Sequence, residues 1–298
     1  MKKITFIINP ISGTKSKVAL PGLIAAQLSL HQDISYEILF SEYAGHCGEL
    51  AAKKVKEGVD IIVAVGGDGT VNEVAKELVH TDVTLGIIPC GSGNGMARHL
   101  GISKDHSKAI ALLINGLSQL IDYGKINDKD LFFCSCGVGF DAKVSYEFAH
   151  APKRGLFTYF NIAIKENFKY KAETYQIITD SGESITNKAF VIACGNAAQY
   201  GNDAFIAPHA SMKDGMLDIT LIEPFNFMQV PLLSYQLFSR NIDKNHKAKS
   251  LRCKKIRIIR EKSGVMHFDG EPIVADKELV IETIPLGLRV VTPFDFAI

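Results

Sequence analysis

The stretch Val59-Asp60-Ile61-Ile62-Val63-Ala64-Val65-Gly66-Gly67-Asp68-Gly69-Thr70-Val71-Asn72-Glu73 decides the fold. Its first part is an apolar run that predicts a strand buried on both faces. A helix pattern, Val71–Val79, follows the glycines directly. A buried strand that leads straight into an amphipathic helix is typical of a parallel sheet covered by helices.

The same alternation extends outward over the first 120 residues. Further strands are predicted at Lys3–Asn9, Ile34–Phe40 and Thr84–Ile88, and further helices at Val18–Leu30 and Gly45–Glu57. These elements predict an α/β domain over residues 1–121.

The pattern changes after about Ile121, where strand-like stretches follow one another. Only two helical patterns interrupt them, near Gly155–Phe168 and Asn226–Arg240. Residues 122–283 are therefore predicted to form a second domain, an antiparallel β-sandwich or sheet with helical insertions.

Composition narrows the class of protein. The chain is 47% hydrophobic and 22% charged, as expected of a globular protein, and its net charge of +1 provides no bulk attraction to nucleic acid. No apolar run reaches about eighteen residues, so we expect no membrane span and, from the start of the chain, no signal peptide. Six cysteines lie mostly in apolar stretches, which favours free thiols in the cytoplasm.

The glycines that follow Val65 suit a phosphate group. They allow the backbone to turn sharply and bring its N–H groups near a ligand, and the start of a helix adds partial positive charge. Asp68 is unusual there, because a carboxylate repels phosphate unless a metal such as magnesium bridges the two. The alternative is a tight turn that caps a helix.

Two more loops of this kind follow neighbouring strands. Pro89-Cys90-Gly91-Ser92-Gly93-Asn94-Gly95-Met96-Ala97-Arg98 comes after one, and Asn9-Pro10-Ile11-Ser12-Gly13 after another. Ser92 and Asn94 are donors for phosphate or a sugar hydroxyl, while Arg98 either pairs with phosphate or lies on a helix surface. Three polar loops at the carboxyl edge of one sheet predict a nucleotide site.

An ordered set of motifs runs through nearly the whole chain: Asn9–Gly13, Gly66–Val74, Pro89–Ala97, Gly137–Asp141, Gly195-Asn196, Met212–Asp218 and Phe268–Pro272. This set resembles the diacylglycerol kinase catalytic-domain family, which includes bacterial lipid kinases, sphingosine kinases and ceramide kinases. The resemblance implies an α/β nucleotide-binding domain like that of phosphofructokinases and NAD kinases, and a β-sandwich that takes the lipid. It also implies that the last strand returns to the first domain, as a C-terminal segment at about 284–298. It also implies an ATP- and Mg²⁺-dependent kinase that phosphorylates a hydroxyl of a lipid alcohol.

The resemblance further implies which residues hold ATP: Asn9, Pro10, Ser12, Gly13, Ser41, Gly66, Gly67, Asp68, Gly69, Thr70, Asn72 and Ser92. It implies that Glu271 is the proton acceptor, with Asp269 and Asp68 as further catalytic acids. In an extended segment, residues two apart share a face, so the carboxylates of Asp269 and Glu271 are expected to point the same way. By itself, Asp269-Gly270-Glu271-Pro272 is equally a hairpin turn signal.

A structural magnesium site is implied at Asp214, with the backbone oxygens of Ser211 and Met216. Hard oxygen ligands suit magnesium, although Asp-Gly is also a strong turn signal.

The identity of the lipid stays open between diacylglycerol and a sphingoid base. The second glycine loop resembles that of sphingosine and ceramide kinases. However, the acid with which those kinases bind the headgroup corresponds to Ser145 here, or to Glu147 if the alignment is shifted by two positions. The apolar helix patterns at Leu156–Ile164 and Phe225–Phe238 indicate either core or an acyl pocket, and Asn241–Lys255 a solvated loop or a membrane contact.

Two alternatives remain, a kinase of NAD or another small molecule and an inactive lipid- or nucleotide-binding module. For the kinase we expect a cytoplasmic protein that contacts membranes transiently during turnover, binds no nucleic acid, and forms either a monomer or a homodimer.

Overall fold

The computed structural model describes residues 1–13, 17–152 and 155–293, and the chain divides into two compact units. The first unit is Met1–Ile121 with Leu286–Ile298, and the second is Asp122–Pro285. The chain passes from one unit to the other within strand β5 (Leu117–Ile126) and returns within strand β16 (Glu278–Thr292). Of the predicted returning segment, residues 294–298 lie outside the described residues.

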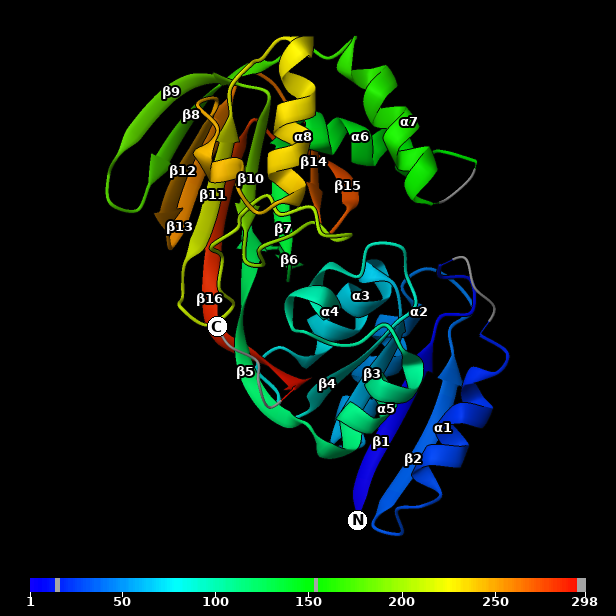
Figure 1. Ribbon diagram of the computed structural model, residues 1–298. Helices are drawn as coiled ribbons and strands as arrows, with labels where there is room; N and C mark the ends of the chain where they lie inside the picture. The colour runs from blue at the N-terminus through cyan, green and yellow to red at the C-terminus, as the bar shows by residue number, and fades with distance from the viewer. Residues whose placement is uncertain (14–16, 153–154, 294–298) are drawn as a thin grey trace. The chain divides into compact units, whose positions relative to one another are not determined.

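The first unit is built on a parallel sheet with the order β2-β1-β3-β4, joined at β4 by the C-terminal part of β16 (Figure 1). Its elements in chain order are β1 (Lys2–Ile8), α1 (Leu20–Leu28), β2 (Ile34–Phe40), α2 (His46–Lys56), β3 (Ile61–Gly66), α3 (Asp68–Leu78), β4 (Thr84–Pro89), α4 (Gly95–His99) and α5 (His106–Asn115).

Burial explains why this sheet forms. Strands β3 and β4 are buried at every position, as expected for strands covered on both faces. Helices α2 and α3 pack together, and so do α1 and α5. The register pairs Ile8 with Val65 and Gly66 with Pro89, so the loops that follow these three strands leave from the same edge of the sheet.

The second unit is a sandwich of two largely antiparallel sheets with helices on one outer face (Figure 1). Its elements are β6 (Asp130–Phe132), β7 (Ser135–Gly139), α6 (Phe140–Ala149), α7 (Leu156–Asn167), β8 (Glu173–Thr179), β9 (Ser184–Ala189), β10 (Val191–Gly195), β11 (Leu217–Ile222), η1 (Phe227–Gln229), α8 (Val230–Phe238), η2 (Ile242–Lys244), β12 (Ala248–Cys253), β13 (Lys255–Arg260), β14 (Gly264–Phe268) and β15 (Glu271–Ala275).

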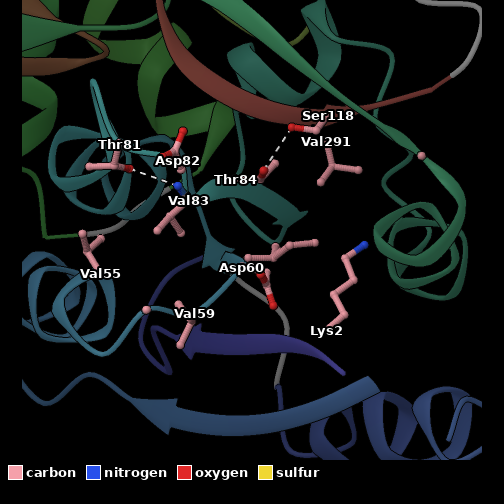
Figure 2. Close-up of a pocket in the computed structure, with 13 residues that line it drawn as sticks. Lys2, Val55, Val59, Asp60, Thr81, Asp82, Val83, Thr84, Ser118 and Val291 are labelled. Atoms are coloured by element: carbon pink, nitrogen blue, oxygen red, sulfur yellow. Dashed lines mark hydrogen bonds between the residues drawn. The ribbon is translucent and has the colours of Figure 1, made fainter. Parts of the chain in front are cut away.

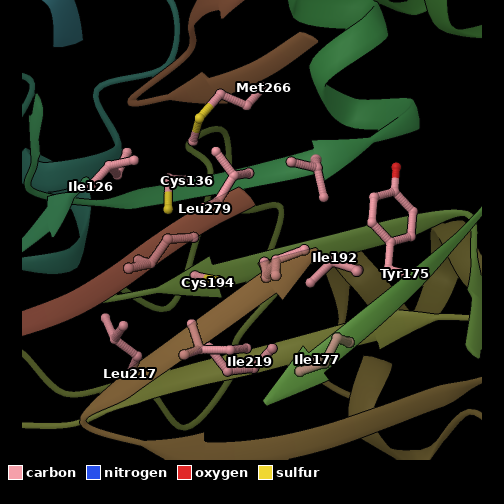
Figure 3. Close-up of a cluster of buried hydrophobic side chains, with 14 of the residues drawn as sticks. Ile126, Cys136, Tyr175, Ile177, Ile192, Cys194, Leu217, Ile219, Met266 and Leu279 are labelled. Atoms are coloured by element: carbon pink, nitrogen blue, oxygen red, sulfur yellow. The ribbon is translucent and has the colours of Figure 1, made fainter. Parts of the chain in front are cut away.

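A continuous apolar core lies between the two sheets (Figure 3). One sheet runs β12-β11-β10-β7-β14-β15, and the other contains β16, β13, β8 and β9. Cys136 of β7 and Ile192 of β10 face this core, while Val191 and Ala193, the neighbours of Ile192 on β10, face a second cluster that includes Leu233 of α8. The alternation is the period of two that a strand imposes on its side chains.

The predicted fold class is confirmed: an α/β unit with a mostly parallel sheet and a β-sandwich with helices. Two local predictions were wrong. A third helix, α6, interrupts the strands of the second unit, where only two helical patterns were expected. The stretch Asn241–Lys255, interpreted as a solvated loop, contains strand β12, which pairs with β11 at the edge of its sheet. An edge strand is half solvated, so its polar composition hides it from a search for apolar runs.

Candidate active site

The three glycine-bearing loops of the first unit are in backbone contact. Gly13 has φ +70°, and a Cβ atom added there would lie 1.9 Å from the carbonyl oxygen of Cys90. A Cβ added at Gly91 would lie 2.6 Å from the Cα of Gly67. Only residues without a side chain allow this approach, so the structure brings these predicted site residues together.

Side chains reinforce the contact between the Asn9–Gly13 loop and the loop that leads from Gly66 to Thr70. The Asn9 amide Nδ2 donates to Thr70 Oγ1 at 3.1 Å, and Asn9 Oδ1 accepts from the backbone N–H of Ile11 at 3.2 Å. Pro10 and Ser92 are exposed at the tips of their loops, whereas Asn72 is buried in α3. The loops thus have a rigid base and an accessible rim.

Asp68 holds the loop Pro89–Arg98 in place. Its carboxylate accepts from the backbone N–H of Asn94 at 2.8 Å and of Gly95 at 2.7 Å, where α4 begins. Asn94 itself is in the left-handed region, with φ 52°. An acid among glycines is therefore explained without a metal, because it satisfies helix N–H groups that have no partner within the helix. A magnesium role for Asp68 stays a prediction.

Two more residues complete the edge of this sheet. Ser41, directly after β2, is buried, and its N–H donates to Ile8 at 2.9 Å. Glu73 accepts from the N–H groups of Gly45 at 3.0 Å and Cys47 at 3.2 Å, so it caps α2 as Asp68 caps α4. The sequence interpretation missed this role of Glu73.

Lys17 is a candidate that sequence reasoning missed. Only 8% of the residue is exposed, and its ammonium donates to the carbonyl of Ser12 in the first loop. Burial lowers the pKa of Lys17, while the nearby Cys90 thiol opposes that shift. A lysine four positions after Gly13 was the available signal, and only burial distinguishes it from the many surface lysines.

A cavity of about 570 Å³ opens at the other edge of this sheet, beside the starts of β1, β3 and β4 (Figure 2). Lys2, Asp60, Asp82, Thr84 and Ser118 contribute its polar lining. No predicted site residue lies among the residues that line it. Ligands of open α/β sheets bind at the carboxyl ends of the strands, which is the opposite edge.

In the second unit, Asp269 and Gly270 form the two-residue turn between β14 and β15, with φ 47° and 83°. The Asp269 carboxylate accepts from the N–H groups of Phe133, Cys134 and Ser135 at 2.8, 2.8 and 3.1 Å. Asp269 and Glu271 therefore do not share one extended face as expected. The turn interpretation describes the backbone here, and Asp269 ties the hairpin to the connection between β6 and β7.

Glu271 differs from Asp269 in its surroundings. It is exposed at the first position of β15, directly across from Phe268. A carboxylate at an exposed strand end can reach a substrate hydroxyl, which a carboxylate surrounded by backbone N–H groups cannot do as readily. Its role as proton acceptor remains a prediction.

A buried polar network lies on the other face of β14. Asp141 Oδ2 accepts from the Tyr200 hydroxyl at 2.8 Å and lies 3.0 Å from His267 Nε2. Burial and the charge of Asp141 raise the pKa of Tyr200. Sequence reasoning named Asp141 only as part of a motif and missed its partners. Ser145, the expected headgroup position, is buried on the same helix, and Glu147 pairs with Lys143.

The predicted metal residues lie in one short turn of the second unit. Asp214 Oδ1 accepts from the N–H of Met216 at 3.0 Å, and Asp214 Oδ2 pairs with Arg252. Ser211 Oγ accepts from the N–H of Lys213 at 3.2 Å. The Arg252 guanidinium thus occupies one oxygen of Asp214, and a magnesium ion held by Asp214 with the backbone oxygens of Ser211 and Met216 stays a prediction. Within the described residues, no group of three or more His, Cys, Asp or Glu side chains is placed to hold a metal.

Comparison with known proteins decides the family. The profile described as the diacylglycerol kinase catalytic domain matches residues 3–126, and that of the YegS C-terminal NAD kinase beta sandwich-like domain matches 134–292. The chain belongs to this family of lipid kinases. The suspected resemblance is thereby confirmed over nearly the whole chain.

Individual relatives agree with this assignment. A "Diacylglycerol kinase" of Mycobacterium tuberculosis is 28% identical, with 98% of this chain and 95% of the relative covered. A "Probable lipid kinase YegS-like" of Yersinia enterocolitica is 30% identical over 78% of each chain. The crystal structure of a diacylglycerol kinase from Bacillus anthracis shares the fold, with a TM-score of 0.78 and 20% identity, and the match covers 99% of this chain and 98% of that chain.

Within the part of the chain that the structure describes, none of the helices combines the length and the apolar character that a membrane span requires.

Proposed function

We propose that this chain transfers the γ-phosphoryl group of ATP to a hydroxyl of a lipid alcohol of the diacylglycerol or sphingoid-base type. The observation that carries the proposal is the backbone contact of three loops at Gly13, Gly67 and Gly91. Side chains would fill that space, so the loops present peptide groups instead, and peptide N–H groups at the start of a helix favour phosphate.

The first unit supplies the groups for the triphosphate. Backbone N–H groups at the start of α3, the buried ammonium of Lys17 and the hydroxyl of Ser92 are the donors for its oxygens. Magnesium, when bound, neutralises phosphate charge during transfer. Asp68 is the residue that would hold it, because its carboxylate supplies hard oxygen ligands at the first position of α3.

The second unit supplies the base. Phosphoryl transfer needs an oriented acceptor hydroxyl and a group that takes its proton. Glu271 serves as that group, because its carboxylate is exposed at a strand end. Asp269 acts through the backbone: by fixing the turn of the hairpin, it positions Glu271.

A substrate panel tests this function. Mixed micelles with diacylglycerol, monoacylglycerol, sphingosine, ceramide or undecaprenol are incubated with γ-labelled ATP and magnesium, and NAD is included as a soluble acceptor. We expect a labelled lipid with diacylglycerol or sphingosine and no labelled NADP. Label in NADP alone would replace the lipid kinase with a small-molecule kinase, and no label in any acceptor would favour an inactive binding module.

The remaining expectations follow from a lipid substrate. We propose that the chain works in the cytoplasm and meets its substrate at a membrane surface, where it binds only transiently. The relatives' names support a lipid acceptor in general and leave its chemical class to the substrate panel.

A further inference from the structure

Two helices of the second unit present large apolar side chains to solvent. Six of them are between 59% and 87% exposed: Phe157, Ile164, Phe168, Phe227, Met228 and Tyr235. We call this set the α7–α8 apolar face. The two helices lie at the same end of the second unit (Figure 1). Isolated exposed apolar residues are ordinary, but a contiguous group of this size marks a contact surface.

The face is continuous between the two helices. The rings of Phe168, at the end of α7, and Phe227, at the start of η1, stack with centroids 5.2 Å apart. On α7, Phe157 and Ile164 are seven residues apart and Phe168 is four further on, a spacing that places all three on one side of the helix.

In α8 this face is additional to the apolar side that the helix turns to the core. In α8, Leu233 is buried in the cluster that contains Val191 and Ala193, whereas Leu232 and Tyr235 are exposed. The sequence pattern had suggested core or an acyl pocket for these helices, and the outer residues are neither buried nor enclosed. A helix with apolar residues on several sides needs a second apolar neighbour.

The charge beside the face indicates what that neighbour is. A basin of about 540 Å³ next to the end of α7 is lined by Lys143, Lys165, Lys169, Lys171, Tyr170 and three glutamates. Lys143 pairs with Glu147 at 2.5 Å and Lys169 with Glu166 at 3.7 Å. Within the described part of the chain, Lys165 and Lys171 form no ion pair. Exposed aromatic rings next to lysines match the boundary of a bilayer with anionic lipids.

We infer that the α7–α8 apolar face is the surface that docks on an anionic lipid bilayer. Phenylalanine, methionine and tyrosine side chains enter the boundary between headgroups and acyl chains, and the lysines contact lipid phosphates. The net charge of the chain, +1, provides no general attraction, so the binding is local to this face. The inference rests on the proposed function in one respect, because a lipid substrate has to be reached at a bilayer.

Vesicle co-sedimentation of the full chain tests the docking surface. Vesicles of phosphatidylcholine alone are compared with vesicles that contain phosphatidylglycerol as well. We expect binding to the mixed vesicles, and we expect the double variant Phe157→Ser/Met228→Ser to lower the partition coefficient about tenfold or more, because it removes two inserted side chains. The matched control is Leu30→Ser, a substitution at a residue that is 80% exposed in the first unit and should bind like the parent.

The lysines are tested separately. Lys165→Gln/Lys171→Gln should weaken binding to phosphatidylglycerol vesicles by about thirtyfold, at roughly 1 kcal/mol per lysine, and raised salt should remove the difference. Equal binding of parent and Phe157→Ser/Met228→Ser would overturn the inference. So would a parent chain that binds neither vesicle, or sedimentation velocity data that show a dimer abolished by the double variant.

Failure of docking is distinguishable from failure of the proposed activity. A short-chain diacylglycerol that dissolves as monomers needs no bilayer, so Phe157→Ser/Met228→Ser should phosphorylate it with the kcat/KM of the parent. Vesicle binding without any lipid phosphorylation would refute the proposed function and leave the docking surface standing. Lost phosphorylation of the monomeric lipid in the double variant would place these residues in substrate binding and contradict a role in docking alone.

Discussion

The glycine loops of the first unit and the Asp269–Glu271 hairpin of the second each contain an acid that shapes the backbone, but only the hairpin adds an exposed acid beside it. Asp68 accepts hydrogen bonds from two backbone N–H groups and Asp269 from three, so both carboxylates stabilise the loops around them. Glu271 is exposed and occupies a strand end. An acid within a Gly-Asp-Gly or Asp-Gly-Glu motif therefore belongs to one of two classes. One class shapes the backbone, and we propose that the other acts on a substrate.

The sharpest test of that distinction is Glu271→Gln. The amide keeps the size of the side chain but accepts no proton at neutral pH, so kcat should fall about 10² to 10⁴-fold. ATP affinity should stay close to that of the parent, because the ATP-binding loops belong to the first unit and Glu271 to the second. Lipid phosphorylation at the parental rate would remove Glu271 from the role of base.

Asp269→Ala should have the next largest effect, on folding rather than on chemistry alone. Three backbone N–H groups would lose a charged acceptor, and the free energy of unfolding should fall by about 3 kcal/mol or more. Urea unfolding measures this, with Asp276→Ala at an exposed position of the same region as the control. If Asp269→Ala unfolds like the control but has no activity, Asp269 belongs with Glu271 as a catalytic acid.

Gly13→Ala tests the contact between the glycine loops. The added Cβ meets the carbonyl of Cys90, so the loops must move apart, and ATP affinity should fall about thirtyfold, equivalent to about 2 kcal/mol. Gly45→Ala is the control, since Gly45 also has a positive φ but no atom within 4 Å of the added carbon. A similar loss in both variants, measured by calorimetry, would show that backbone strain and not loop contact matters.

The smallest effect is expected for Lys17→Met. Loss of one donor should raise the KM for ATP about fivefold, or about 1 kcal/mol, while Lys56→Met on the exposed end of α2 should change nothing. Because burial lowers the pKa of Lys17, the ammonium loses its charge at a lower pH than an exposed lysine does. The KM for ATP should therefore rise as the pH increases through that lowered pKa. Lys17→Arg, whose guanidinium stays charged, should not show the rise.

Sequence patterns predicted the parallel sheet and the three loops because both are local. Apolar runs such as β3 and the glycines after them lie within a few residues of each other. The partners of the acids are not local: Asp68 binds amides 26 and 27 residues away, and Asp269 binds amides at least 134 away. No spacing rule shows which backbone groups such a carboxylate will meet, so both acids were assigned to chemistry.

The helices α7 and α8 show a second limit of sequence reasoning. Their apolar positions indicate that a surface is buried but not what buries it. Leu233 faces the core and Tyr235 faces solvent, although both belong to the same apolar stretch. Only the packed structure separates the side that contacts protein from the side available to lipid.

The central claim is that the loops at Gly13, Gly67 and Gly91 hold the triphosphate. A crystal structure of the chain with magnesium and a non-hydrolysable ATP analogue tests it most directly. Our account predicts phosphate oxygens against the backbone N–H groups at the start of α3. A nucleotide bound instead in the cavity at the opposite edge of the sheet, beside Lys2 and Asp60, would contradict it.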